Sequence, residues 1–125
     1  GKKIAVWGLS FKPETDDMRE APSIDLINSI VKAGGEVNAY DPKAMKEAEF
    51  YLKNIKVNYC NDKYSATEDA DALILVTEWK EFRSPDFDLI KSKMNGNLFI
   101  DGRNQFKFDY IQNKGFKYVQ IGVKV

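Results

Sequence analysis

The chain has 125 residues, 43% of them hydrophobic and 13% aromatic, so it is long enough to bury the core of one domain, residues 1–125. Its 19 basic and 19 acidic side chains cancel, which argues against a partner bound through net charge, such as a nucleic acid or a membrane surface. No apolar run approaches the roughly 20 residues that a membrane span needs, no secretory signal opens the chain, and the first residue is Gly1 rather than Met, as in a fragment of a longer protein.

Short apolar runs alternate with amphipathic segments along the whole chain. In chain order they predict a strand at 3–7, a helix at 22–33, a strand at 36–40, a helix at 43–52, strands at 56–59 and 71–77, a helix at 82–94, a strand at 97–100, a helix at 108–115 and an edge strand at 117–121. Pro22 suits the first position of a helix, and Gly34 suits the end of one.

This alternation predicts the α/β class: a doubly wound, mainly parallel Rossmann-like sheet with helices on both faces, in a single domain. In such a sheet the carboxyl ends of the strands share one edge, and ligands bind there, where the strand order reverses. The predicted loops at that edge are residues 8–21, 41–42, 77–79 and 101–104.

The loop after the first strand differs from a dinucleotide-binding loop. A dinucleotide fingerprint places three glycines there, but this chain has Gly8, Ser10 and Pro13 at those positions. The loop is also long, because βα loops usually have about 2–6 residues, and long ordered loops at the ligand edge tend to be functional. Lys12 and Arg19 are its cations, and we expect them to point at different anionic groups.

The acidic residues of this loop allow two interpretations. Asp16 and Asp17 can organise the loop by accepting backbone N–H groups or by holding Arg19 in place. Alternatively, the loop is a solvated segment of mixed charge whose surface ion pairs contribute little.

Arg103 follows a buried strand and can bind phosphate or carboxylate through its guanidinium fork. The alternative is a salt bridge to Asp101 or to a neighbouring loop. In a 3-2-1-4-5 sheet the fifth strand lies two positions from the first, roughly 10 Å away. Lys12 and Arg103 are therefore placed to bind one extended ligand, such as a nucleotide sugar.

Three further residues have both a structural and a functional interpretation. Trp79 is expected in the core rather than as a stacking platform, and Asp41 is either a ribose-binding acid or a helix entry before a proline. The single Cys60 is expected to be a buried structural thiol, consistent with a reducing, cytoplasmic location. Because the chain has no His, we predict neither a metal site nor a catalytic triad.

Four stretches resemble the C-terminal domain of UDP-glucose 6-dehydrogenases, within the UDP-glucose/GDP-mannose dehydrogenase family. They are GLSFKPETDDMREAPS, AYDPKA, DALILVTEWKEFRSPDF and LFIDGRN, in this order along essentially the whole chain. The resemblance implies an enzyme that oxidises UDP-glucose to UDP-glucuronate in two NAD-dependent steps.

The resemblance also implies roles for individual residues. Phe11, Lys12 and Arg103 would contact the UDP-sugar, and Arg19 would reach the NAD pyrophosphate. NAD itself would be held mainly by an N-terminal domain of the same polypeptide, and a central region would form a homodimer. Neither of these segments is present in this sequence.

The catalytic cysteine of the family belongs to the absent segments, and Cys60 lies in no catalytic motif. We therefore assign no catalytic residue, and we expect residues 1–125 to be inactive alone. The alternative is a stand-alone CoA- or nucleotide-binding Rossmann module, since such proteins also carry a Gly-x-Ser-x-x-Pro turn. A receiver-like domain is excluded because the third strand ends near Cys60 rather than at an aspartate.

Overall fold

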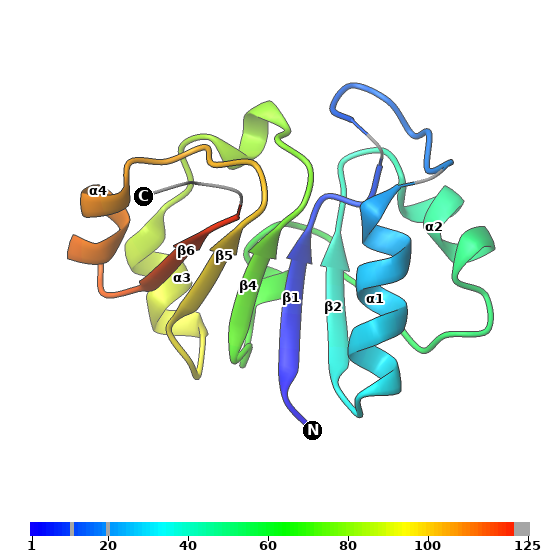
Figure 1. The fold of residues 1–125 in the computed structure, drawn as a ribbon, viewed down its shortest axis with the longest axis horizontal. Coiled ribbons are helices and arrows are strands. Elements are labelled where there is room, and N and C mark those ends of the chain that lie inside the picture. Colours follow the sequence, from blue (N-terminus) through cyan, green and yellow to red (C-terminus); the bar gives the residue numbers. More distant parts are fainter. Residues whose placement is uncertain (11, 20, 122–125) are drawn as a thin grey trace.

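The computed structural model describes residues 1–10, 12–19 and 21–121. Within these ranges six strands form one sheet in the order β3-β2-β1-β4-β5-β6, and every neighbouring pair is parallel (Figure 1). The strands are β1 Lys3–Trp7, β2 Glu36–Tyr40, β3 Asn58–Tyr59, β4 Ala72–Leu75, β5 Leu98–Asp101 and β6 Lys117–Gln120. The predicted α/β sheet is confirmed, with β6 at one edge and the reversal of strand order between β1 and β4.

Helices lie on both faces of the sheet. They are α1 Pro22–Lys32, α2 Met45–Tyr51, α3 Phe87–Lys93 and α4 Phe108–Asn113, with short 3-10 turns η1 Ser65–Thr67 and η2 Lys80–Phe82. Apolar side chains of α1 and α2 pack on one face, and those of α3 and α4 pack on the other. None of the described helices is both long and apolar enough to cross a membrane.

Alternating side chains of β1 divide the core into two layers. Val6 is buried against α1 and α2, where it packs with Ile27. Trp7, the next residue, enters the opposite layer, where its ring stacks on Phe82 with the centroids 4.8 Å apart. Both side chains are fully buried, so β1 is the centre of the fold.

The third helix begins later than the sequence predicts. Residues 82–94 were expected to be helical, but α3 starts at Phe87 and η2 ends at Phe82. Pro85 precedes Asp86, whose carboxylate accepts a hydrogen bond from the backbone N–H of Leu89 at 3.0 Å and caps the helix. The third strand is also shorter than predicted, at residues 58–59, and η1 was not predicted.

Candidate functional site

The carboxyl ends of all six strands lie along one edge of the sheet, where the loops rise above the arrowheads (Figure 1). The loop after β1, residues 8–21, is the longest of these connections. Its neighbours at the reversal point are the loops after β2 and β4, because β1 pairs with both strands. This edge is the expected ligand site of a doubly wound sheet.

A buried carboxylate, that of Asp41 after β2, fixes the start of this loop. Its Oδ2 accepts hydrogen bonds from the backbone N–H of Leu9 at 2.7 Å and of Ser10 at 3.2 Å. The indole N–H of Trp79, in the loop after β4, donates to the same oxygen at 3.1 Å. One oxygen therefore joins the three loops at the point where the strand order reverses.

The second carboxylate oxygen of Asp41 caps the chain entering α2. It accepts hydrogen bonds from the backbone N–H groups of Lys43 and Ala44, both at 2.8 Å. Asp41 is fully buried and both its oxygens are engaged, so it has no free acceptor for a ribose. Trp79 is 5% exposed and packs in the core, so its interpretation as a core residue is confirmed.

The carbonyl groups at the start of the loop are also engaged. The Ser23 hydroxyl donates to the carbonyl oxygen of Leu9 at 2.6 Å, and the Thr77 hydroxyl donates to that of Ser10 at 2.8 Å. The amides that would face a pyrophosphate in a dinucleotide-binding loop already donate to Asp41. The first turn therefore does not form a dinucleotide cradle.

Farther along the loop, Asp17 holds Arg19. Its carboxylate accepts hydrogen bonds from Nε of Arg19 at 3.1 Å and from Nη2 at 3.0 Å, and also from the Arg19 backbone N–H at 2.9 Å. These hydrogen bonds lower the pKa of Asp17 to about 2. Asp17 thus organises the loop as predicted, whereas Asp16 is exposed and has no recorded hydrogen bond to a described residue. The Arg19 side chain is 79% exposed and points outward.

Of the two predicted nucleotide-sugar contacts in this loop, only Lys12 can be placed. Lys12 is exposed at a bend, and its carbonyl oxygen accepts a hydrogen bond from the Ser10 hydroxyl at 2.9 Å. Phe11 lies outside the described residues. The Lys12 backbone is therefore hydrogen-bonded to the buried Ser10, while the Lys12 side chain is exposed to solvent.

The loop after β5 is built on another buried carboxylate, that of Asp101. It accepts hydrogen bonds from the backbone N–H groups of Arg103 at 2.8 Å and Gln105 at 2.7 Å, and from the Tyr118 hydroxyl at 2.6 Å. The Arg103 side chain turns away from Asp101, and its Nε donates to Glu78. Of the predicted alternatives, the salt bridge to a neighbouring loop is present, while 49% of the Arg103 side chain stays exposed.

The sequence interpretation missed two of these partners. Glu78 lies between Thr77 and Trp79, and only Trp79 was considered as a functional residue of that segment. Tyr118 lies on β6, far from Asp101 in the sequence. The sequence predicted an edge strand at 117–121 but did not indicate that the Tyr118 hydroxyl would bind Asp101.

The single thiol, that of Cys60, makes no hydrogen bond to the described residues of the loops after β1, β2, β4 and β5. Cys60 is half-buried after β3, and burial raises the pKa of its thiol, which disfavours a reactive thiolate. In the ranges that the structure describes, no group of three or more His, Cys, Asp or Glu could hold a metal ion.

Comparison with known proteins assigns the chain to a family. Residues 5–108 match the UDP binding domain of the UDP-glucose/GDP-mannose dehydrogenase family. The chain belongs to this family. The family assignment also decides between the two interpretations of the Gly-x-Ser-x-x-Pro turn, against the stand-alone CoA-binding module.

Relatives and solved structures agree with this family assignment. The chain is 44% identical over 122 residues to the UDP-glucose 6-dehydrogenase of Rhizobium meliloti and 44% identical over 126 residues to that of Pseudomonas aeruginosa. Each alignment covers 98% of this chain but only 28% of the relative, so the chain spans less than a third of these proteins.

A solved structure, the NDP-N-acetyl-D-galactosaminuronic acid dehydrogenase of Methanosarcina mazei Go1, is 29% identical. It superimposes with a TM-score of 0.83 over 99% of this chain and 25% of its own. The whole described sheet is thus an architecture that this family uses.

Proposed function

We propose that residues 1–125 are the nucleotide-sugar-binding C-terminal domain of an NAD-dependent UDP-glucose 6-dehydrogenase. The complete enzyme oxidises UDP-glucose to UDP-glucuronate in the cytoplasm. The observation that carries the proposal is the match to a UDP binding domain in a chain whose ligand edge presents two exposed cations, Lys12 and Arg103. They extend from the loops after β1 and β5, which are two strands apart.

In this proposal the UDP-sugar lies across the carboxyl ends of β1, β4 and β5. Lys12 and the backbone at Phe11 bind it from one side, and Arg103 binds it from the other. Because Nε of Arg103 donates to Glu78, both terminal nitrogens stay available for a bidentate contact with phosphate. Lys12 contributes a point charge that neutralises the diphosphate.

NAD binds elsewhere in this proposal, because none of the described amides in the first turn of the loop after β1 is free to bind its pyrophosphate. The amides of Leu9 and Ser10 donate to Asp41, so we propose that an N-terminal domain of the same polypeptide holds the cofactor. Bound there, NAD would supply the hydride acceptor for the oxidation. Arg19, whose side chain is held by Asp17, would then contact the pyrophosphate of NAD. The complete enzyme would be a homodimer, and residues 1–125 contribute binding groups but no catalytic residue.

Calorimetric titration of the full-length protein tests these roles. Lys12→Ala and Arg103→Ala should each weaken UDP binding by about 1–3 kcal/mol, the range for charge-assisted hydrogen bonds. Arg19→Ala should weaken NAD binding and leave UDP binding unchanged. Lys32→Ala, an exposed cation in the last turn of α1, is the control and should change neither. Unchanged affinities in all three site variants would contradict the proposal.

The domain assignment has its own test. Purified residues 1–125 should show no NAD reduction with UDP-glucose, since the proposed cofactor domain and catalytic cysteine are missing. Detectable turnover would overturn the division into domains. Tight binding of CoA by the same chain, without binding of UDP-sugars, would instead support the stand-alone module.

A further inference from the structure

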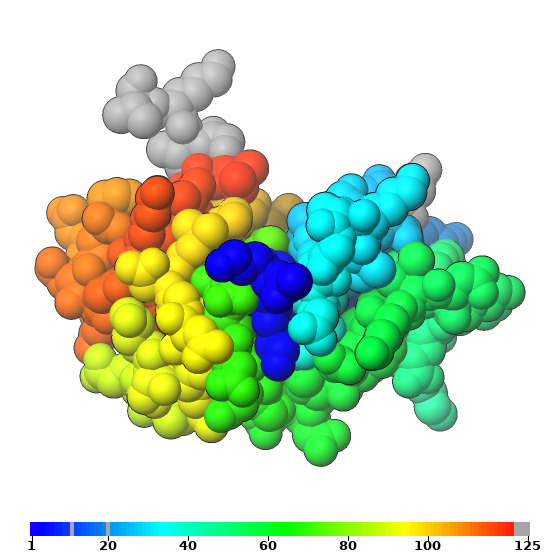
Figure 2. All heavy atoms as spheres, turned by 90° about the horizontal axis from the view of Figure 1, so that it is seen from below, coloured from blue at the N-terminus to red at the C-terminus, as the bar shows by residue number. Residues whose placement is uncertain are grey.

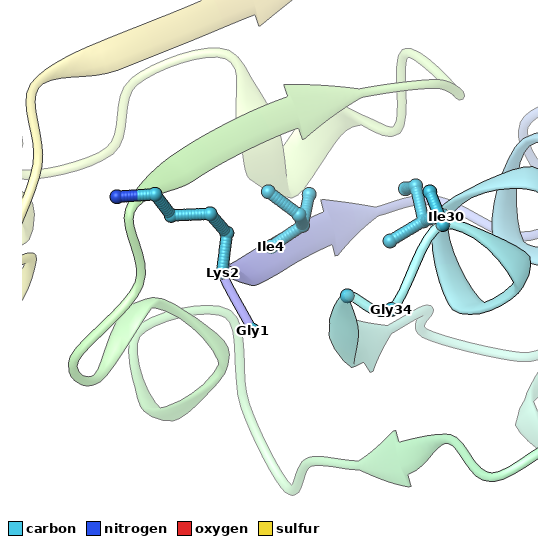
Figure 3. Close-up of a pocket in the computed structure, with 7 residues that line it drawn as sticks. Gly1, Lys2, Ile4, Ile30 and Gly34 are labelled. Carbon is cyan, nitrogen blue, oxygen red and sulfur yellow. The ribbon is translucent and has the colours of Figure 1, made fainter.

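A groove runs along the α1 side of the sheet. Two cavities of about 510 and 330 Å³ share Lys2 and Ile4 at its lower end. A third, of about 460 Å³, lies between α1 and the upper ends of β4 and β5, where it reaches Arg103 of the proposed nucleotide-sugar site. Figure 2 shows the hollow between α1 in cyan and the strands in yellow and red, and Figure 3 shows Ile4 and Ile30 on its two sides. The apolar side chains that line the groove are Leu26, Ile30, Ile74, Leu98 and Ile100, and Val119 lies beside Ile100 on β6. Polar residues lie at its two ends: Lys2, Asp71 and Asn97 at the lower end and Arg103 at the upper end.

A row of paired residues crosses the floor of this groove. Val6, Ile74, Ile100 and Val119 are successive register partners on β1, β4, β5 and β6, so they project from the same face. Val6 lies under α1 and is fully buried, Ile74 and Ile100 are half-buried, and Val119 is 37% exposed. The apolar row thus continues beyond the helix layer that covers its first member.

The topology explains why this half of the face is open. The segments that connect β4 to β5 and β5 to β6 carry α3 and α4, and both helices pack on the other face. Parallel sheets are normally covered on both faces, because their strands are apolar on both sides. Among the described residues, no helix covers the α1 side of β5 and β6. An exposed apolar surface of this kind indicates an interaction site.

We propose that an amphipathic helix from the rest of the same polypeptide packs into this groove, beside α1. This inference rests on the proposed function, in which residues 1–125 are part of a longer dehydrogenase. The relatives support such an occupant, since the matched region is 28% of their length and most of the polypeptide lies outside it. The groove follows the 11-residue α1, which is about 16 Å long, so a helix of at most about three turns fits beside it and ends below Arg103, which stays available to the nucleotide sugar.

A second copy of this chain cannot fill the groove with its own sheet face or with its own α1. α1 stands on the sheet beside the open face and prevents the flat face of another sheet from approaching closely. The outward side of α1 is polar, with Asp25, Ser29 and Lys32 exposed, so the α1 of a second copy offers no apolar surface to the groove. A helix with an apolar stripe matches the apolar lining of the groove between its polar ends.

Thiol labelling of the full-length protein tests this contact. Val119→Cys places a thiol on the floor of the groove, and Ser29→Cys places the matched control on the outward side of α1. Maleimide modification is followed peptide by peptide, so that native thiols such as Cys60 are counted separately. We expect position 119 to react at least tenfold more slowly than position 29. Equal rates in the full-length protein would overturn the proposal.

Labelling of residues 1–125 alone distinguishes the possible occupants. Position 119 should then react as fast as position 29 at any protein concentration. Slow labelling that becomes fast on dilution would overturn the proposal in favour of a second copy, and slow labelling at all concentrations would overturn it in favour of a cover within residues 1–125.

A second measurement needs no substitution and covers the case in which Val119→Cys does not fold. Hydroxyl-radical footprinting of the unmodified proteins should find Ile100 and Val119 oxidised at least threefold less in the full-length protein than in residues 1–125. Equal oxidation would overturn the proposal. Titration with UDP keeps the two proposals separate: protection without UDP binding would contradict the proposed function alone, and UDP binding without protection would contradict this inference alone.

Discussion

The Oδ2 atom of Asp41, at the end of β2, lies 2.7 Å from the backbone nitrogen of Leu9, at the start of the loop after β1. This contact uses an amide that a dinucleotide-binding loop would offer to phosphate. It also fixes the base of a loop whose cations, Lys12 and Arg19, are exposed. The buried carboxylate therefore shapes the loop, and the exposed side chains remain available for a ligand.

Replacement of the Asp41 carboxylate should lower the stability of the fold. Asp41→Asn puts an amide group among five N–H donors, so at least two of these donors lose their acceptor. We expect the free energy of unfolding in urea to fall by about 2–4 kcal/mol. Asp25→Asn, in the exposed first turn of α1, is the control and should cost less than about 1 kcal/mol. Similar costs for the two variants would show that the Asp41 contacts do not stabilise the fold.

Gly8, in the turn after β1, can be compared with Gly34, which follows α1. Both have positive φ, at 94° and 91°. A Cβ at Gly8 would lie 2.5 Å from Cβ of Thr77, whereas a Cβ at Gly34 would meet nothing within 4 Å. Gly34→Ala should therefore cost only the backbone strain, about 1–2 kcal/mol. Gly8→Ala adds the clash and should cost about 2–5 kcal/mol in the same unfolding measurement. Equal costs would contradict the close approach of β1 and β4 at this point.

The carboxylate of Asp17 should titrate at low pH. Its hydrogen bonds from Arg19 lower its pKa from 3.8 to about 2. Because the folded-state pKa is lowered, the pair contributes stability above pH 3.8, and this contribution is lost as the pH falls toward 2. NMR titration of the side-chain carboxyl carbon measures the midpoint.

Two variants separate the causes of the lowered pKa of Asp17. Arg19→Ala should return the midpoint toward 3.8, because it removes the side-chain hydrogen bonds. Lys12→Ala should move it much less, since Lys12 acts on Asp17 only through space. An unchanged midpoint in the Arg19 variant would mean that the ion pair is absent in solution.

The sequence was sufficient to predict the sheet and the loops at the carboxyl ends of its strands, because both depend on patterns that are local in the chain. The apolar run from Ala72 to Val76 predicted a strand within residues 71–77, and β4 occupies residues 72–75. The substitution of Ser10 and Pro13 for glycines predicted that the first turn is not a dinucleotide cradle. The structure gives the physical reason, which is that the amides of this turn donate to Asp41.

The contacts that the sequence did not predict connect loops far apart in the chain. Arg103 pairs with Glu78, Tyr118 donates to Asp101, and Trp79 donates to Asp41. Each of these side chains had several possible partners at the same edge, and only the packing of the strands selects one. The late start of α3 has a local cause, because Pro85 lies just before Asp86 and Asp86 caps the helix.

Hydrogen exchange of the full-length protein, with and without saturating UDP, tests the location of the ligand most directly. If the nucleotide sugar binds at the carboxyl edge, amides in residues 8–21 and 101–105 should exchange more slowly when UDP is bound. Amides in residues 33–36 and 94–97, at the opposite edge, should be unaffected. Protection confined to the opposite edge, or no protection at saturating UDP, would contradict the placement of the site.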